Sequence, residues 1–199
     1  MPKKYEITDI SCGGGLFRIR RLADGTLGGC IESEKNLNQA GACWVGGDAR
    51  VSDKARVAGN AQVTDSARVT GHAQVAGDAV VKDNARIGGY ARVTTSALIG
   101  DNALIGAHAK IMDSARVIGN AKVYDRAQVW GRALVEGHAR VRDDARISGD
   151  TRIGGHARIG GATRIQSGTI MEGELRSPVK PAHRQREIEG LQRPRRVAP

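Results

Sequence analysis

A six-residue repeat runs through most of this chain and restricts its fold more than any other feature. Val or Ile occupies every sixth position from Val45 to Ile165, and no residue is inserted between these positions. Four residues after each Val or Ile comes a small residue, nearly always Ala, and two residues after it the chain mostly carries Gly or Asp. A six-residue step matches neither the 3.6-residue period of a helix nor the alternation of a long strand, so neither explains the pattern.

Each six-residue unit reads as one short strand followed by one corner. In the Ala-x-Val part of a unit, the two apolar side chains are two residues apart and therefore share one face of a strand. The Gly or Asp that follows, together with Asn, Ser or His after it, tolerates the backbone of a tight turn. Aromatic residues make up only 3% of the chain. The repeat therefore predicts a coil of short strands around a narrow core of Val, Ile and Ala.

This pattern resembles the hexapeptide repeat of left-handed parallel β-helix proteins. The resemblance implies an all-β, single-stranded left-handed parallel β-helix, in which three units form one triangular coil and residues 18 apart stack. About seven coils are expected over residues 45–175. The left hand is implied by the resemblance alone, because ordinary crossover connections favour the right hand.

The two ends of the chain lack the regular repeat. Residues 5–7 and 16–19 alternate like paired strands on either side of a Gly-rich loop at 11–15, which predicts a β cap over the exposed end of the coil. Ile31, Leu37 and Cys43 keep the six-residue step before the frame shifts to Val45, so residues 1–44 are expected to form this cap and an imperfect first coil. The basic tail, 176–199, could form a short helix from Pro181.

Residues 28–33, 37–39 and 41–45 resemble the segment that leads into the repeat in a bacterial and prophage-encoded group of hexapeptide-repeat proteins, commonly described as acetyltransferases. With the repeats, the resemblance covers about residues 3–172. It implies a phage or prophage origin and an acyl-CoA-dependent O- or N-acetyltransferase, with acetyl-CoA as cosubstrate and His108 or His138 as general base. Such enzymes typically build their site with a loop that leaves the coil. The uninterrupted repeat favours a non-catalytic scaffold or binding protein instead.

Four histidines, all predicted at corners, are the candidates for chemistry. His72 and His108 are expected two coils apart on one corner with Tyr90 between them, and His138 and His156 on adjacent coils of another. They could supply a catalytic base or a metal pair, or they could be exposed turn residues. The close histidine pair of a β-helical zinc enzyme is absent from the sequence, and we expect no metal or cofactor. A column of Asp65, Asp83 and Asp101 could bind calcium or simply form turns.

The outward-facing positions of the repeat carry much of the formal charge of +10. One predicted row consists mainly of arginines: Arg50, Arg68, Arg86, Arg140 and Arg158. Such a row suits a polyanion, either a nucleic acid or an acidic glycan. The alternative is that the arginine stems cover the apolar wall and keep it hydrated.

Another row is apolar and predicts an interface. Its outward positions include Val80, Leu98 and Leu134, with Ile118 alongside, and Met112 and Trp130 stack on the adjoining face. An apolar strip on a charged surface usually marks a contact with another chain. We therefore expect self-association, most simply as a homotrimer.

The cysteines and the hydropathy suggest where such a protein resides. Cys12, Cys30 and Cys43 are an odd number without a CxxC motif, so we expect reduced cysteines rather than a disulfide framework. An apolar run long enough for a signal peptide or a membrane span is not found, so a membrane partner is not expected. These features favour a cytoplasmic protein, or a virion-associated one if it is a phage structural protein.

Overall fold

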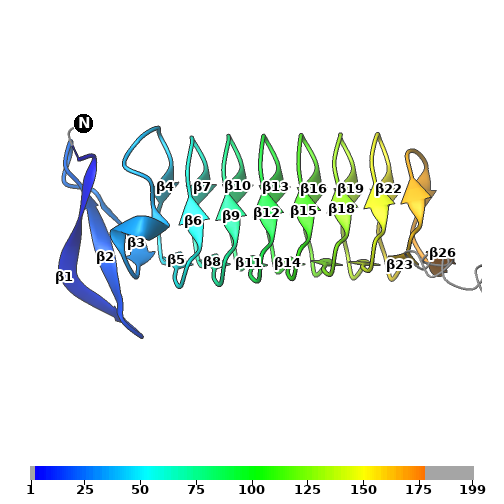
Figure 1. Cartoon of the computed structure of the whole chain (residues 1–199), viewed down its shortest axis with the longest axis horizontal. Helices are drawn as coiled ribbons and strands as arrows, with labels where there is room; N and C mark the ends of the chain where they lie inside the picture. The colour runs from blue at the N-terminus through cyan, green and yellow to red at the C-terminus, as the bar shows by residue number, and fades with distance from the viewer. Residues whose placement is uncertain (1–2, 178–199) are drawn as a thin grey trace, which may run out of the picture.

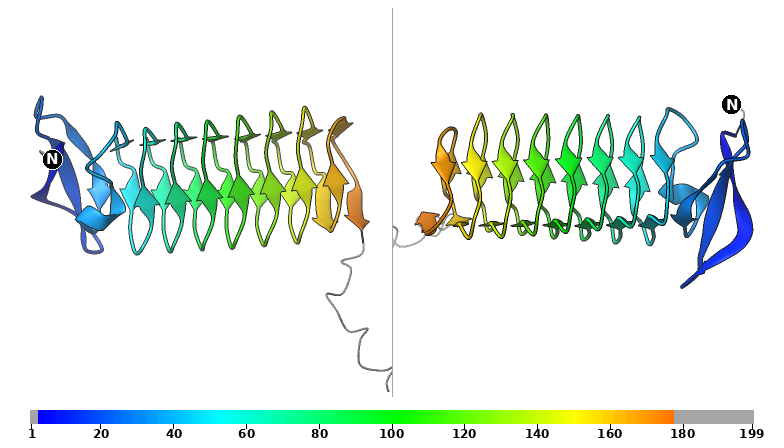
Figure 2. Two further views of the ribbon diagram at one scale, coloured as in Figure 1. Left: turned by 45° about the horizontal axis from the view of Figure 1, so that its top comes forward. Right: turned by 180° about the vertical axis from the view of Figure 1, so that it is seen from behind.

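The structure, a computed structural model, describes residues 3–177. These residues form a long prism of stacked coils, and a flat β-hairpin closes its N-terminal end (Figures 1 and 2). The chain winds through about eight turns of a parallel β-helix and forms three sheets, here called walls A, B and C. The predicted all-β fold with a parallel β-helix is confirmed.

Wall A is the longest sheet and includes the hairpin. In spatial order its strands are β1 (Tyr5–Gly13), β2 (Leu16–Arg21), β3 (Leu27–Ile31), β5 (Arg50–Val51), β8 (Arg68–Val69), β11 (Arg86–Ile87), β14 (Leu104–Ile105), β17 (Lys122–Val123), β20 (Arg140–Val141), β23 (Arg158–Gly161) and β26 (Glu174–Ser177). β2 is antiparallel to both β1 and β3, and all later pairs are parallel.

Walls B and C contain parallel strands only. Wall B consists of β6 (Arg56–Val57), β9 (Gln74–Val75), β12 (Arg92–Val93), β15 (Lys110–Ile111), β18 (Gln128–Val129), β21 (Arg146–Ile147) and β24 (Arg164–Ile165). Wall C consists of β4 (Trp44–Val45), β7 (Gln62–Val63), β10 (Val80–Val81), β13 (Leu98–Ile99), β16 (Arg116–Val117), β19 (Leu134–Val135), β22 (Arg152–Ile153) and β25 (Thr169–Ile170). The helical content is one 3₁₀ turn, η1 (Glu34–Asn36), among the described residues.

The strand register confirms that residues 18 apart stack. Ile87 lies opposite Val69 on wall A, and Ile99 lies opposite Val81 on wall C. The inward Val and Ile residues from Val45 to Ile159 are at most 1% exposed, and the alanines two residues before them are fully buried. The core is therefore a column of small aliphatic side chains, which explains why the chain needs so few aromatic residues.

Aspartates at the corners connect successive coils. Seven aspartates adopt a positive φ: Asp53, Asp65, Asp83, Asp101, Asp113, Asp125 and Asp143. Each accepts, through Oδ2, the backbone N–H of the residue one coil further on, at 2.8 to 3.2 Å. The N–H of Asp101, followed by the adjacent Lys82, lowers the pKa of Asp83 below its usual value. These Oδ2 atoms therefore connect the coils, which favours the turn-forming role of Asp65, Asp83 and Asp101 over calcium binding.

The first coil differs from the regular ones. Ile31 pairs with Val51, so this coil spans 20 residues instead of 18. Leu37 bridges to Val57, and Val45 pairs with Val63. The step from Leu37 to Val45 is eight residues, whereas the step from Val57 to Val63 on the next coil is six, so the extra length lies between Leu37 and Val45. The wide loop that results is visible next to β4 in Figure 1. The predicted imperfect first coil is thus produced by two additional residues at one corner.

The hairpin covers the open end of the first coil. Tyr5 is fully buried, and its hydroxyl donates a hydrogen bond to the carbonyl oxygen of Leu37 at 2.7 Å. Burial, followed by the charges of Glu34 and Cys43, raises the pKa of Tyr5 to about 12. Through the buried Tyr5 and its hydrogen bond, the hairpin covers an end of the β-helix that would otherwise be open to water.

The ends of the chain differ from the sequence-based expectation in one respect. Cys12 and Cys30 form a disulfide between β1 and β3, so the prediction of three reduced cysteines is wrong for this pair. Spacing alone could not reveal it, because the antiparallel hairpin brings the two residues together. The predicted helix from Pro181 lies outside the described residues. Within residues 3–177, no helix is long and apolar enough to cross a membrane.

Candidate functional site

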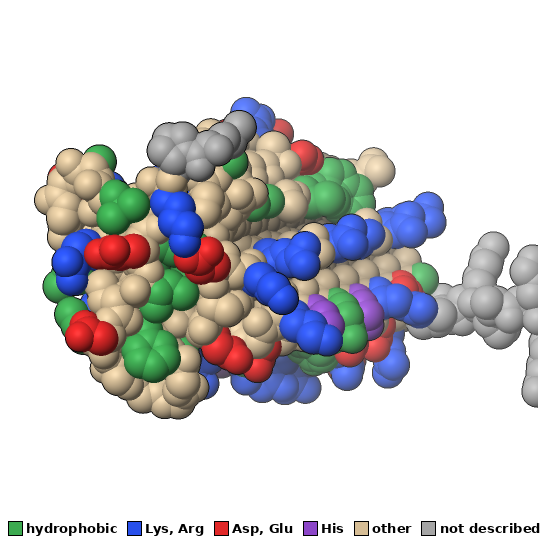
Figure 3. All heavy atoms as spheres, turned by 60° about the vertical axis from the view of Figure 1, so that its left-hand side comes forward, with side chains coloured by type: hydrophobic (Ala, Val, Ile, Leu, Met, Phe, Trp, Pro, Cys, Tyr) green, Lys and Arg blue, Asp and Glu red, His purple; other side chains and the backbone are tan. Residues whose placement is uncertain are grey.

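A basic groove follows the edge of wall A. Its wall side carries Arg68, Arg86, Leu104 and Lys122 on successive coils, and its corner side carries Ser66, Asn84, Asn102 and Asn120. The groove has a volume of about 530 Å³, and no acidic residue is among those that line it in the described structure. Each outward basic residue comes from the same position of the repeat, so the rows of Lys and Arg seen along the prism follow directly from the sequence (Figure 3).

The groove continues toward the hairpin. A second hollow of about 400 Å³ shares Ser66 and Arg68 with it and adds Arg18 and Arg50. Arg18 is held by Asp48, with Nη2 and Oδ1 2.7 Å apart. Among residues 3–177, the five predicted polyanion-binding arginines take part in no salt bridge: Arg50, Arg68, Arg86, Arg140 and Arg158.

The strand register places these arginines on one line. Arg50, Arg68 and Arg86 are direct neighbours on β5, β8 and β11, and Arg140 and Arg158 are neighbours on β20 and β23. Neighbouring strands lie about 4.8 Å apart, where two exposed unit charges in water repel by somewhat less than about 1 kcal/mol. A ligand with regularly spaced negative charges would offset this repulsion.

The histidines form two stacked columns at different corners. His72 and Tyr90 have ring centroids 4.5 Å apart, and Tyr90 and His108 have centroids 5.0 Å apart. His138 and His156 stack in the same way at 5.0 Å, beside Arg140 and Arg158 of wall A. All four histidines are exposed. The predicted columns are confirmed, and the two proposed general bases, His108 and His138, belong to separate columns.

The apolar strip lies on wall C and the neighbouring corner. Val80 pairs with Leu98, but Arg116 separates Leu98 from Leu134. All six predicted interface residues are half-buried within the single chain: Val80, Leu98, Met112, Ile118, Trp130 and Leu134. The more exposed large apolar side chains include Ile10, Phe17, Leu22 and Leu27, which belong to the hairpin segment, and Tyr90 and Leu104 on the coils.

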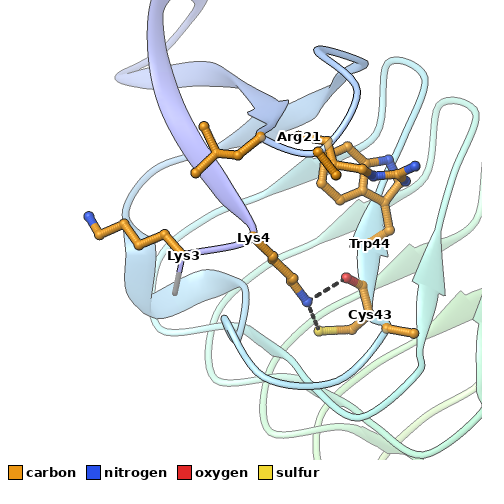
Figure 4. A pocket seen from close by; sticks show the side chains of 8 residues that line it. Lys3, Lys4, Arg21, Cys43 and Trp44 are labelled. Atoms are coloured by element: carbon orange, nitrogen blue, oxygen red, sulfur yellow. Dashed lines mark hydrogen bonds between the residues drawn. The ribbon is translucent and has the colours of Figure 1, made fainter. Parts of the chain in front are cut away.

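The sequence did not predict a pocket where the hairpin meets the first coil. It has a volume of about 580 Å³ and is lined by Lys3, Lys4, Arg21, Leu22, Ala23, Ala42, Cys43 and Trp44. In Figure 4 the guanidinium of Arg21 covers the ring of Trp44, with Cζ 4.4 Å from the ring centroid. The signal for this pocket was present in the sequence as the change from a six-residue to an eight-residue step between Leu37 and Val45.

The lysine at the floor of this pocket supports the wide loop. The Nζ atom of Lys4 donates to the carbonyl oxygens of Gly41 and Cys43 at 3.2 and 2.8 Å, and lies 3.1 Å from Sγ of Cys43. Gly41 has a φ of 75°, and a Cβ there would lie 2.3 Å from the carbonyl oxygen of Gly59. Lys4 therefore stabilises a loop whose path requires this glycine.

Within residues 3–177, no three His, Cys, Asp or Glu side chains lie close enough together to hold a metal ion. In comparisons with known proteins, the chain matches no family model and no curated protein. The resemblance to hexapeptide-repeat acetyltransferases therefore depends on the sequence pattern alone. The left-handed winding, the prophage origin and the acetyltransferase activity that it implies stay predictions.

Proposed function

We propose that this protein is a non-catalytic β-helical scaffold that associates with copies of itself. The observation that supports this proposal is the apolar strip of Val80, Leu98 and Leu134, with Ile118, Met112 and Trp130 beside it, on a prism whose outward rows are mainly polar and charged. Aliphatic and aromatic side chains in such a setting gain free energy when a second chain covers them. A rigid stack of identical coils also presents this strip in a fixed, linear arrangement.

A cyclic homotrimer closes such a surface most simply, because each chain then contributes the same strip. In light scattering coupled to gel filtration, the protein should elute at three times its chain mass of 21.1 kDa. Leu98→Glu should shift it to the monomer, since a carboxylate would be desolvated in the contact. Leu104→Glu, the same substitution on wall A, is the matched control and should leave the mass unchanged. A monomeric wild-type protein would contradict the proposal.

A second candidate function is the binding of a linear polyanion along wall A. The support for it is the groove without acidic lining residues and the unpaired arginines beside it. Binding of heparin fragments or of single-stranded DNA should weaken steeply with salt, because each neutralised charge releases counterions. The groove lining contains no aromatic residue on which bases could stack, so heparin should bind more tightly than DNA at equal salt.

Two double variants test this candidate, each replacing two neighbouring basic residues by Glu, one on wall A and one on wall B. Arg68→Glu with Arg86→Glu should abolish heparin binding, whereas Arg92→Glu with Lys110→Glu on wall B should reduce it only modestly through the lower net charge. Equal losses from the two pairs would mean that binding is a nonspecific effect of charge. No binding of either ligand at low salt would end the polyanion hypothesis.

Acetyl transfer remains the alternative that the sequence resemblance implies. His108 and His138 are exposed and stacked on neighbouring rings, and the regular coils that carry them have no inserted loop that would enclose a substrate. This geometry favours the scaffold. Calorimetry with acetyl-CoA should detect no binding, and micromolar affinity that is lost in His108→Ala or His138→Ala would instead support the enzyme. A cytoplasmic or virion-associated location stays a prediction.

A further inference from the structure

The pocket beside Trp44 exists because the first coil is longer than the others. Two additional residues move the loop between Leu37 and Val45 away from the axis of the prism, and the start of β1 and the end of β2 lie across the gap. The regular coils return to the same path every 18 residues. The pocket is therefore found at the one corner where the cap and the β-helix do not share a common register.

The dimensions and lining of this pocket suit a small molecule. A volume of about 580 Å³ lies within the range of small-ligand sites, which are mostly apolar with a few placed polar groups. Leu22, Ala23, Ala42 and Trp44 supply apolar surface from two sides of the opening. Leu22 is 49% accessible, so burying its side chain against a ligand would be favourable.

The charge in the pocket is entirely positive. Lys3, Lys4 and Arg21 line it, and none of its described lining residues is acidic. The donors of Lys4 are directed to the loop, as described above. Lys3 and Arg21 each contact one exposed carboxylate outside the lining: Lys3 contacts Glu34 at 2.7 Å, and Arg21 contacts Asp24 at 3.2 Å.

Arg21 retains most of its capacity to bind an anion. A guanidinium has five N–H donors in a planar fork, and only Nη1 is engaged with Asp24. The ring of Trp44 holds the guanidinium plane in place, which limits the conformational entropy lost on binding. A carboxylate could therefore form charge-assisted hydrogen bonds with Arg21 while the rest of the ligand contacts the apolar side.

We propose that this pocket binds a small amphipathic carboxylate, a molecule with an apolar chain or ring and one carboxylate end. The carboxylate contacts Arg21 and Lys3, and the apolar part lies against Leu22, Ala42 and Trp44. This site is independent of the apolar strip on wall C and of the groove on wall A. Its occupancy therefore does not depend on the proposed function.

The test uses calorimetry on the full chain with three probes of equal length: octanoate, octanol and octylamine. Octanoate should bind with one molecule per chain. Octanol should bind about tenfold more weakly or not at all, because it lacks the charge that Arg21 recognises, and octylamine should not bind. Equal affinity for octanoate and octanol would overturn the proposal, as would the absence of octanoate binding.

Variants locate the site. Arg21→Gln should weaken octanoate binding about tenfold, whereas Arg20→Gln, the neighbouring arginine, which pairs with Glu6 instead of lining the pocket, should leave it unchanged. Ala42→Phe should fill the pocket and abolish binding. Because that variant could also disturb the loop, Ala23→Phe fills the same space from the opposite side. Octanoate binding that survives both fillings, or that falls equally in Arg20→Gln and Arg21→Gln, would place the ligand elsewhere.

Discussion

The regular coils and the first coil are built from similar residues, yet they differ in what they offer a ligand. In the regular coils, every unit has six residues, each wall repeats after 18, and the surface consists of straight rows with shallow grooves between them. In the first coil, two additional residues and a hairpin produce a pocket with an apolar side and a cationic side. A regular repeat thus makes a stable scaffold, and a small departure from it makes a concave site.

This contrast has a physical origin. In the regular coils, the corner N–H groups are bonded to the next coil, and the outward strand residues pair with their equivalents on the coils above and below. A ligand there meets straight rows of side chains along a wall and its adjoining corner. The first coil lacks a preceding coil, so its end must be covered by chain of another geometry, and the covering is incomplete where the two meet.

Deletions should separate the two regions most strongly. Removing Ser114 from a regular corner shortens one coil and breaks the bond from its N–H to the carbonyl oxygen of Gly131, so we expect a loss of at least about 3 kcal/mol. Removing Ala40 and Gly41 restores the 18-residue coil and should cost about 1 kcal/mol. Thermal unfolding followed by circular dichroism measures both. Equal losses would contradict the distinction between the regions.

The aspartate column predicts the next largest effect. Asp101→Ala removes the acceptor for the N–H of Gly119 and places alanine at a φ of 54°, which should lower the free energy of unfolding by about 2 kcal/mol. Asp101→Asn keeps an acceptor and tolerates this φ, so its loss should be about 0.5 kcal/mol. Urea unfolding of both variants tests the column, and similar losses would show that the side-chain bond contributes little.

The first coil should respond to alkaline pH through Tyr5. Because folding raises the pKa of Tyr5 to about 12, its contribution to stability is complete below pH 10 and is lost as the pH rises toward 12. Tyr5→Phe removes the bond to the carbonyl oxygen of Leu37 and should cost about 1 kcal/mol at pH 8. The difference between the two proteins should shrink between pH 10 and pH 12 in urea unfolding, and a constant difference would disprove this assignment.

The smallest expected effect is a gain in stability from a substitution at one corner of the regular coils. Ala107 has a φ of 52°, a conformation in which a Cβ is unfavourable. Ala107→Gly should therefore raise the free energy of unfolding by about 0.5 kcal/mol, while Gly89→Ala, one coil earlier at a φ of 65°, should lower it by about 1 kcal/mol. Changes of the same sign in both variants would contradict the role of φ at this corner.

Much of the fold could be predicted from the sequence because each repeat unit encodes its own strand and corner. The stacking of Val69 on Ile87 and the columns of His72, Tyr90 and His108 follow once residues 18 apart are superposed. The groove on wall A could be predicted only as a row of arginines, because its depth depends on the Asn and Ser side chains of the adjacent corner. The polyanion and interface assignments stay predictions.

The sequence by itself determined the solenoid, its inward and outward faces and the irregularity of its first coil, because these depend on residues close together in the chain. Only the tertiary structure decided the path of the hairpin, the disulfide of Cys12 with Cys30 and the pocket of Arg21 and Trp44. These features depend on how two segments of different periodicity meet. No local sequence pattern specifies how the hairpin contacts the first coil. That contact depends on the packing of side chains such as Tyr5 against the end of the β-helix, which forms only when the β-helix folds.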